Sequence, residues 1–208
     1  MSIKTDLRRA MRDTRRIALP DVQPAIQAVA REQLPALLGP SGLLGIYWPL
    51  PGEADLRDLG PALGDRLALP VVQRSGPAET AAGSPGRLLY RAWRRDQPLE
   101  PDGCGIPAPP PTARELGAAD LALLLVPALA IDQGGYRLGY GGGWYDRLRA
   151  DPAWMQVPAL AVLPAACRFD QLPRDPWDLP LSGWLSEDGV HWCRAGDGPA
   201  PRGNISGS

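Results

Sequence analysis

Five short runs of apolar residues constrain the fold of this chain more than any other feature. The runs lie at residues 43–48, 67–72, 88–93, 121–126 and 159–163. Several are apolar throughout instead of alternating with polar residues, which is typical of strands covered on both faces. Because helical segments are expected between successive strands, the pattern predicts an α/β fold, a three-layer α/β/α sandwich with a largely parallel sheet. It leaves the order of the strands open.

The first 40 residues are predicted to form two helices. The first contains Asp6, Leu7 and Met11, carries several arginines on one face and is expected to end near Leu19-Pro20. Asp21 suits the N-cap of the second helix, which presents an apolar stripe and is expected to end before Gly39. Residues 56–67 are also expected to be helical.

The chain has the size and composition of one domain. It has 208 residues, of which 44% are hydrophobic, and this is enough for one core. We predict a single domain over residues 1–194 and a mobile tail over residues 195–208, where apolar side chains are rare. Residues 73–87 and 98–111 are rich in glycine, proline or alanine and are predicted to be loops.

Charge and cysteine content exclude several classes of function. Lys and Arg number 22 and Asp and Glu number 23, so a net charge of -1 offers no extended field for a polyanion, and nucleic acid is not expected as a partner. The 3 cysteines are widely spaced, which favours reduced thiols. No stretch has the length and apolar character of a secretory signal or a membrane span. We therefore expect a cytoplasmic protein without a membrane partner, and a monomer.

Residues 137–147 carry most of the candidate chemistry. They read Arg-Leu-Gly-Tyr-Gly-Gly-Gly-Trp-Tyr-Asp-Arg, after an apolar run and before an expected helix. Glycines let the main chain approach a ligand closely, and amides at a helix start favour phosphate oxygens. Arg137 can bind a phosphate, and Asp146 can hold Mg²⁺. The segment fits neither the dinucleotide fingerprint nor the phosphate loop that ends in Gly-Lys-Ser/Thr.

Each of these features also has an ordinary structural interpretation. The glycines alone could form a flexible turn, with Arg137 solvated and Asp146 only favouring the start of a helix, and the two interpretations carry about equal weight. A basic helical face with Lys4 and Arg8 is by itself more typical of solvated side chains. Glu53 follows Pro-Gly, where turn residues are common, and aromatic residues near strand ends are more often part of a core.

The glycine-rich segment at 137–147, preceded by Val-Pro-Ala-Leu-Ala-Ile-Asp, resembles the signature of the 5-formyltetrahydrofolate cyclo-ligase family, also called methenyltetrahydrofolate synthetases. Other stretches resemble the family in the same order. They are Lys-Thr-Asp-Leu-Arg at 4–8, Tyr-Trp-Pro-Leu-Pro-Gly-Glu-Ala-Asp at 47–55, Gly-Ile-Pro-Ala-Pro at 105–109, Leu-Pro-Arg-Asp-Pro-Trp-Asp at 172–178 and Trp-Leu-Ser-Glu at 184–187. The resemblance covers roughly residues 3–190.

The resemblance implies roles for the matched residues. The catalytic group would be Arg137, Lys4 and Arg8, which would stabilise the transferred phosphoryl group, and Asp146 would be the metal ligand. Residues expected to bind the folate are Trp48, Glu53, Tyr140 and Trp144. Residues expected to bind ATP are Lys4, Thr5, Asp6, Leu7, Arg8, Arg137, Leu138, Gly139, Tyr140, Gly141, Gly142, Gly143, Trp144 and Tyr145.

The implied reaction is the ATP- and Mg²⁺-dependent conversion of 5-formyltetrahydrofolate to 5,10-methenyltetrahydrofolate, with release of ADP and phosphate. The formyl oxygen would attack the γ-phosphate, and N10 would then close the ring. Because an oxide or hydroxide leaves poorly, phosphorylation of the formyl oxygen explains the need for ATP. The protein would position the reactants and neutralise charge.

Two positions depart from the family pattern. Ser182 stands where an aspartate is common, and Ala108 stands where a glutamate commonly precedes proline. Loss of that aspartate could remove a metal contact, although Mg²⁺ usually takes only one or two protein carboxylates. These departures leave a non-catalytic folate- or nucleotide-binding protein on the same scaffold as an alternative. An unrelated ATP-dependent kinase of a small metabolite would explain the glycine-rich segment but not Lys4, Arg8 and Glu53.

Overall fold

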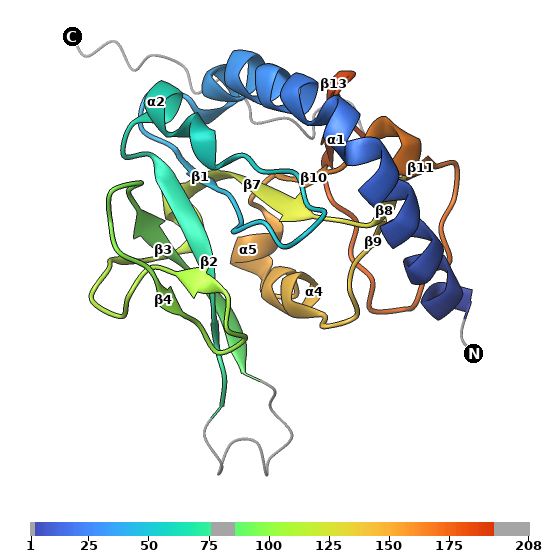
Figure 1. The fold of residues 1–208 in the computed structure, drawn as a ribbon. Coiled ribbons are helices and arrows are strands. Elements are labelled where there is room, and N and C mark those ends of the chain that lie inside the picture. The colour runs from blue at the N-terminus through green and yellow to red at the C-terminus, as the bar shows by residue number, and fades with distance from the viewer. Residues whose placement is uncertain (1–2, 76–85, 194–208) are drawn as a thin grey trace, which may run out of the picture.

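An eight-stranded sheet forms the centre of the computed structural model, which describes residues 3–75 and 86–193 (Figure 1). In spatial order its strands are β13 (Gly189–Trp192), β12 (Gly183–Ser186), β10 (Ala159–Val162), β7 (Leu121–Pro127), β1 (Leu43–Gly45), β2 (Leu67–Gln73), β3 (Arg87–Trp93) and β6 (Glu115–Leu116). The strands from β12 to β2 pair in parallel, and β13, β3 and β6 add antiparallel pairs at the two edges. The prediction of a largely parallel sheet is confirmed.

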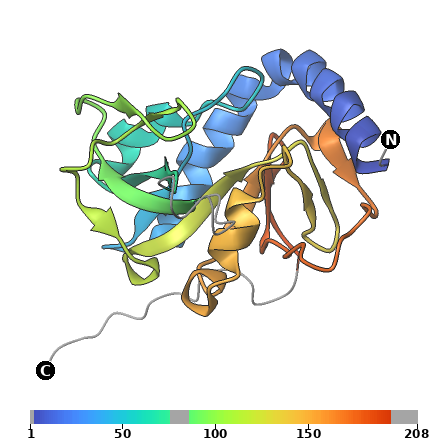
Figure 2. The same ribbon diagram turned by 90° about the horizontal axis from the view of Figure 1, so that it is seen from below.

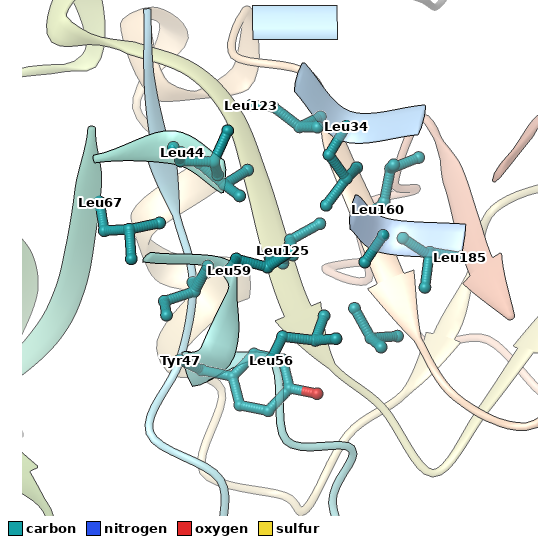
Figure 3. Close-up of a cluster of buried hydrophobic side chains, with 14 of the residues drawn as sticks. Leu34, Leu44, Tyr47, Leu56, Leu59, Leu67, Leu123, Leu125, Leu160 and Leu185 are labelled. Carbon is teal, nitrogen blue, oxygen red and sulfur yellow. The ribbon is translucent and has the colours of Figure 1, made fainter. Parts of the chain in front are cut away.

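Helices cover both faces of this sheet. α1 (Ile3–Leu38) lies across one face, and α4 (Trp144–Arg149) and α5 (Pro152–Met155) lie on the other (Figure 1). Within β7, Leu123 and Leu125 pack with Leu34 of α1 (Figure 3), whereas Leu124 and Val126 belong to the cluster on the α4 side. Successive side chains of a strand point to opposite faces, so a strand between two helical layers must be apolar throughout. The three-layer prediction is confirmed.

The prediction of two N-terminal helices is wrong, because residues 3–38 form the single helix α1 with Pro20, Pro24 and Pro35 inside it. A proline in a helix interior removes a main-chain hydrogen bond and costs about 3 kcal/mol or more. The helix bends along its length (Figure 2) and continues, because apolar residues on both sides of Pro20 are buried on the sheet. These residues are Leu19, Ile26, Ala30, Leu34 and Leu38. Burial of one large aliphatic side chain contributes about 1.5–3 kcal/mol, so the stripe offsets the prolines.

Short elements connect the strands. β1 is shorter than the predicted run at 43–48, and the predicted helix at 56–67 is reduced to η1 (Arg57–Leu59) and α2 (Gly60–Leu63). η2 (Ala118–Asp120) precedes β7, and η3 (Ala165–Cys167) follows β10. The predicted loop at 98–111 contains the paired strands β4 (Glu100–Pro101) and β5 (Pro107–Ala108). Most of the loop predicted at 73–87 and the tail predicted at 195–208 lie outside the described residues.

A second, three-stranded sheet extends the fold beyond the end of β7. It consists of β11 (Arg168–Phe169), β8 (Ala130–Asp132) and β9 (Arg137–Leu138), in that order. Leu7 and Met11 of α1 pack against an apolar cluster that this sheet forms with Leu172. β9 is the beginning of the glycine-rich segment, so this small sheet sets where that segment lies. Within the described residues, no helix combines the length and apolar character needed to cross a membrane.

Candidate active site

A cavity of about 630 Å³ lies at the carboxyl ends of the parallel strands. In open α/β sheets this edge is where ligands bind, and the volume suits a small-molecule site. Its wall combines the start of α1, the segment after β1, parts of β2 and β3, the glycine-rich segment and the segment around residues 175–178. The fold therefore brings together parts of the chain that are far apart in sequence.

The glycine loop, which we define as residues 139–143, connects β9 to α4 and forms one wall of the cavity. Gly141 has φ +98° and Gly143, the N-cap of α4, has φ +62°, so both adopt a conformation that side chains with a Cβ rarely accept. A Cβ at Gly139 would lie 2.3 Å from Nη1 of Arg137. The conformation of the loop therefore favours glycine at 141 and 143, and a Cβ at 139 would displace the Arg137 guanidinium.

Two arginines hold the carbonyl groups of this loop. Nε of Arg8 donates to the Gly139 oxygen at 2.9 Å, and Nη1 of Arg147 donates to the Gly142 oxygen at 2.9 Å. The guanidinium of Arg147 also lies 4.5 Å from the centre of the Trp144 ring. Because α1 and α4 each supply one donor, the loop is fixed from both sides. Arg147 had no predicted role, although it closes the glycine-rich segment in the sequence.

Arg137 and Asp146 form an ion pair across the loop. Nη2 of Arg137 lies 3.0 Å from Oδ2 of Asp146, and the side chains are 7% and 25% exposed. The guanidinium also lies 5.5 Å from the centre of the Tyr145 ring. Both residues line the cavity. A cation and a carboxylate are therefore adjacent at the cavity wall, and their roles toward a phosphate and a metal stay predictions.

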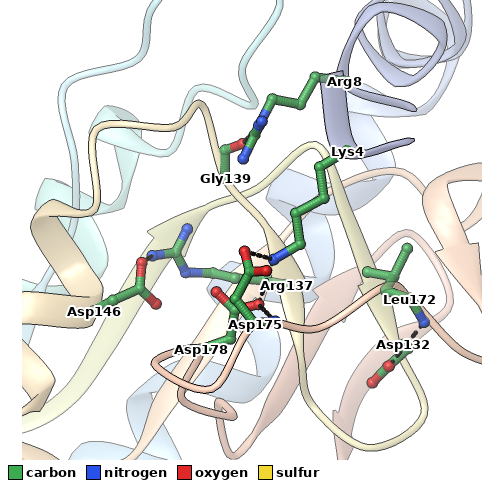
Figure 4. A network of polar contacts seen from close by, with 9 residues as sticks. All are labelled: Lys4, Arg8, Asp132, Arg137, Gly139, Asp146, Leu172, Asp175 and Asp178. Carbon is green, nitrogen blue, oxygen red and sulfur yellow. Dashed lines mark hydrogen bonds and ion pairs between the residues drawn. The ribbon is translucent and has the colours of Figure 1, made fainter. Parts of the chain in front are cut away.

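Lys4 is bound by two carboxylates that had no predicted role. Its Nζ lies 2.6 Å from Oδ2 of Asp175 and 2.5 Å from Oδ2 of Asp178, and all three residues line the cavity (Figure 4). Burial lowers the pKa of Lys4, but the hydrogen bonds and charges of Asp175 and Asp178 outweigh it and raise the pKa above its usual value. The ammonium form is therefore stabilised at the wall of the cavity.

Glu53 lies at the other end of the cavity and is almost completely buried, with 7% exposure. Its Oε2 accepts the Leu50 amide at 2.8 Å, and its Oε1 is among the buried atoms without a hydrogen-bond partner. Burial raises the pKa of the Glu53 carboxyl, and Tyr140, the Leu50 amide and Arg15 only partly oppose this. A buried carboxylate oxygen without a partner is suited to accept an N–H group from a ligand.

Aromatic rings surround this end. Trp48 packs edge-on against Trp93 at 6.4 Å between ring centres, and the Arg57 guanidinium lies 4.2 Å from the centre of its ring. Arg15, with 4% exposure, lies 5.4 Å from the centre of the Tyr140 ring, and burial raises the pKa of the Tyr140 hydroxyl. The rings and charges can enclose a flat, polar-edged heterocycle.

The structure does not bring every predicted residue to the cavity. Lys4, Arg8, Trp48, Glu53, Asp146 and residues 137–145 line it. Thr5, Asp6 and Leu7 do not line it: Thr5 and Asp6 are exposed, and Leu7 packs against the small sheet. Their contact with ATP stays a prediction.

The two departures from the family pattern are both accommodated inside the fold. Ala108 is buried with Val71 and Leu89 in a small apolar cluster. The hydroxyl of Ser182 accepts the Ala159 amide at 3.2 Å. Neither residue lines the cavity. Neither therefore specifically supports the alternative hypothesis of a non-catalytic folate- or nucleotide-binding protein.

Fold and cavity together define an α/β protein with a ligand-sized cavity at the carboxyl edge of its sheet. The sequence matches the profile described as the 5-formyltetrahydrofolate cyclo-ligase family over residues 1–186. A 5-formyltetrahydrofolate cyclo-ligase from Mycolicibacterium smegmatis is 33% identical over 190 residues, which cover 88% of this chain and 93% of that protein. The cyclo-ligase of Escherichia coli strain K12 is 27% identical over 177 residues, 82% of this chain and 93% of that protein. The chain therefore belongs to the 5-formyltetrahydrofolate cyclo-ligase family.

Solved structures show the same fold. The NMR structure of Aquifex aeolicus 5,10-methenyltetrahydrofolate synthetase superimposes with a TM-score of 0.70 at 24% identity, covering 99% of each chain. A 5,10-methenyltetrahydrofolate synthetase from Mycoplasma pneumoniae superimposes with a TM-score of 0.63 at 19% identity, covering 89% of this chain and 99% of that one. At these identities the likeness establishes the architecture alone.

Proposed function

We propose that this enzyme converts 5-formyltetrahydrofolate to 5,10-methenyltetrahydrofolate with Mg²⁺ and ATP, and releases ADP and phosphate. The observation that carries the proposal is the composition of one cavity. Lys4, Arg8 and Arg137 line its cationic end with the glycine loop, and Glu53 and Trp48 line the other. Cations and main-chain amides suit a triphosphate, and a buried carboxylate beside aromatic rings suits a reduced pterin.

In the proposed reaction the formyl oxygen attacks the γ-phosphorus of ATP. The bond between that phosphorus and the oxygen shared with the β-phosphate breaks, and ADP leaves. N10 then attacks the activated formyl carbon and gives up its proton to solvent. Phosphate leaves with the former formyl oxygen, and the ring is closed. The transferred oxygen thus departs as phosphate, a much better leaving group than hydroxide.

The side chains bind and orient the reactants, and none has to act as a nucleophile. Arg137, Lys4, Arg8 and the amides of the glycine loop neutralise the charge of the phosphates. Glu53 accepts N–H groups from the pterin, and Trp48 covers the ring. Holding the formyl oxygen in line with the γ-phosphorus is the main contribution of the protein, because phosphoryl transfer depends chiefly on position and charge.

Asp146 fits the proposed Mg²⁺. Its carboxylate supplies the hard oxygen that Mg²⁺ prefers, and its side chain stays 25% exposed at the cavity wall while Arg137 holds it. Across residues 3–75 and 86–193, no group of three or more His, Cys, Asp or Glu is arranged to hold a metal. Mg²⁺ tolerates this, because it usually takes one or two protein carboxylates and completes its shell with phosphates and water. When bound, it supplies further neutralisation of the phosphate charge.

The remaining features of the proposal concern the cellular setting. Cys104 and Cys167 are free thiols. Free thiols suit the reducing cytoplasm, which we propose as the location of the enzyme. We propose that it acts as a monomer on small molecules, without nucleic acid or membrane as a partner.

One assay tests the proposed reaction. Purified protein is mixed with 5-formyltetrahydrofolate, ATP and Mg²⁺, and the absorbance of methenyltetrahydrofolate is followed together with ADP. We expect both products in equal amounts, and neither when ATP is omitted. Tight folate binding without product would support the non-catalytic alternative and refute the proposal. ADP formed without methenyltetrahydrofolate would point to a kinase instead.

A further inference from the structure

We propose that Arg15 is a positioning residue that keeps Glu53 in the ionised form in which it accepts N–H groups from the folate. The proposal deepens the proposed function, because it rests on the role of Glu53 in folate binding given above. It assigns a function to a buried charge that does not line the cavity and has no part in the mechanism so far.

The side chain of Arg15 extends from α1 to three other segments of the chain. Its Nη1 donates to the Ala128 oxygen at 3.1 Å, in the segment between β7 and β8. A Cβ at Gly52 would lie 3.7 Å from Nη2, so the guanidinium reaches the residue that precedes Glu53. The guanidinium also lies 5.4 Å from the centre of the Tyr140 ring in the glycine loop. The fold therefore holds this cation beside the turn that carries Glu53.

The guanidinium of Arg15 and the carboxyl of Glu53 are both buried and incompletely paired. Arg15 is 4% exposed, its Nη1 contacts a neutral carbonyl, and its Nε is among the buried atoms without a hydrogen-bond partner. Oε1 of Glu53 is buried without a partner as well. Burial of a charge is costly unless an opposite charge compensates it. Each group therefore lowers the cost of keeping the other one charged.

The ionisable groups that act on Glu53 come from four parts of the fold. They are Arg15 on α1, Tyr47 after β1, Tyr140 in the glycine loop and Tyr145 on α4. Burial raises the pKa of each of these tyrosine hydroxyls, so the tyrosines are neutral at pH 7. Burial also raises the pKa of the Glu53 carboxyl, and Tyr140, a main-chain amide and Arg15 oppose this. Within this set, Arg15 supplies the positive charge.

Loss of that charge should affect folate binding in a way that depends on pH. Without Arg15 the pKa of the Glu53 carboxyl should rise further, because the positive charge that favours the carboxylate is gone. At acidic pH a smaller fraction of Glu53 is then ionised, and the folate loses its charged acceptor. At higher pH Glu53 is ionised with or without Arg15, and the difference becomes small. A purely structural role of Arg15 would instead weaken folate binding by the same factor at every pH.

Fluorescence titration with 5-formyltetrahydrofolate tests this dependence on the variant Arg15→Gln. Glutamine keeps an N–H donor for the Ala128 oxygen but removes the charge. We expect the Kd for folate to rise about three- to tenfold over wild type near pH 5.5, and less than about twofold near pH 8.5. An equal loss at both pH values, or no loss at either, would overturn the proposal.

The matched control is Arg91→Gln. Arg91 is also buried, with 8% exposure, its Nη1 donates to the Pro109 oxygen at 3.1 Å, and its Nε likewise has no hydrogen-bond partner. It does not line the cavity either. The control should leave the Kd for folate unchanged at both pH values. If it reproduced the loss at acidic pH, general loosening of the fold would explain the effect and the proposal would be overturned.

A double-mutant cycle shows whether Arg15 acts through Glu53. In a Glu53→Gln background, adding Arg15→Gln should change the Kd for folate less than about twofold, because the carboxylate that Arg15 compensates is absent. Effects that multiply would overturn the proposal. If Arg15→Gln alone does not fold, the double variant should fold, since no buried carboxylate is left without its cation. A double variant that also fails to fold would show that Arg15 supports the fold independently of Glu53, and this would overturn the proposal.

The titration of Glu53 itself provides a measurement without folate or turnover. In ligand-free protein labelled with ¹³C at the glutamate carboxyls, the signal of Glu53 is identified by its loss in Glu53→Gln. Its titration midpoint should lie at higher pH in Arg15→Gln than in wild type. An unchanged midpoint would overturn the proposal. Failure of the proposed function is recognised separately: unaltered folate affinity in Glu53→Gln would remove Glu53 from the folate site, whatever the midpoint shows.

Discussion

Replacing Glu53 with glutamine is predicted to stabilise the fold at neutral pH while it weakens folate binding. Burial raises the pKa of the Glu53 carboxyl above its ordinary value of 4.5, despite the opposing effects of Tyr140, the Leu50 amide and Arg15. A raised pKa in the folded state means that the fold favours the neutral form. The ionised carboxylate therefore reduces the free energy of unfolding as pH rises above 4.5. Glutamine resembles the neutral form at every pH.

The magnitude follows from the contacts of Glu53. Glutamine keeps an oxygen for the Leu50 amide, which lies 2.8 Å from Oε2, and removes the charge on Oε1, which has no hydrogen-bond partner. An unsatisfied buried polar group costs about 1–3 kcal/mol. We take about 1 kcal/mol, since the glutamine amide also needs a partner, and this corresponds to about 2–4 °C in Tm for a chain of this size. Loss of charge-assisted bonds to the pterin should weaken folate binding by about 10–100-fold.

Urea unfolding at about pH 4 and about pH 7.5 measures the effect. We expect Glu53→Gln to unfold at a higher urea concentration than wild type near pH 7.5, with a smaller difference near pH 4, where Glu53 becomes protonated. Folate affinity is measured on the same preparations by fluorescence titration. A variant less stable than wild type near pH 7.5, or a difference independent of pH, would refute the reasoning about burial. Unchanged folate affinity would remove Glu53 from the folate site.

Three further predictions concern the catalytic groups, the core and the thiols. Arg137→Ala and Asp146→Ala should each lower kcat by about 10²-fold or more. The circular dichroism spectrum should stay that of wild type. Wild-type turnover in either variant would remove that residue from the mechanism. Leu125→Ala, at a position with 0% exposure, should lower the free energy of unfolding by about 2–5 kcal/mol in urea; a loss well below that range would contradict close packing there. Burial raises the pKa of the Cys167 thiol to about 11, so Cys167 should react with a thiol reagent only after unfolding. The exposed Cys104 should react in the native protein. Rapid labelling of Cys167 in the native protein would contradict its burial.

The strands were predictable because their pattern is local. Residues 67–72, 88–93, 121–126 and 159–163 each coincide with a strand. An uninterrupted apolar run already contains the information that both faces are buried. The order of the strands depends on which runs meet across the sheet, and a single sequence carries no local signal for that. β12 and β13 were missed as strands because they are short. The resemblance matched residues 184–187 to the family but predicted no secondary structure for them.

The error at Pro20 has a different origin. Local rules place a helix boundary at a proline, and Asp21 suits an N-cap. Both signals are weaker than the burial of one continuous stripe from Leu19 to Leu38 against the sheet. Tertiary packing therefore overrides the local preference, and the outcome is a bent helix (Figure 2).

At the site, the residues alone predicted the groups that occur together in one segment, and the resemblance added Lys4, Arg8, Trp48 and Glu53 from elsewhere in the chain. The carboxylates that contact Lys4 were missed. The glycine loop, Arg137 and Asp146 were found because they are neighbours in sequence. Asp178 contacts Lys4 from 174 residues away, and no spacing rule connects such a pair. Only the resemblance drew attention to residues 172–178, and it gave them no role.

The single helix explains how both ends of the cavity are coordinated. Residues 4, 8 and 15 of α1 lie within about 40° of one another around a helix with 3.6 residues per turn, so they share one face. Lys4 and Arg8 line the cationic end of the cavity. The Arg15 guanidinium donates to the Ala128 oxygen at 3.1 Å and lies beside Tyr140 at the other end. A boundary at Pro20 would have placed this basic half on a separate element. In the single bent helix, the basic half packs on the small sheet through Leu7 and Met11, and the apolar half packs in the core. The cations are therefore carried by an element that is fixed at both of its ends.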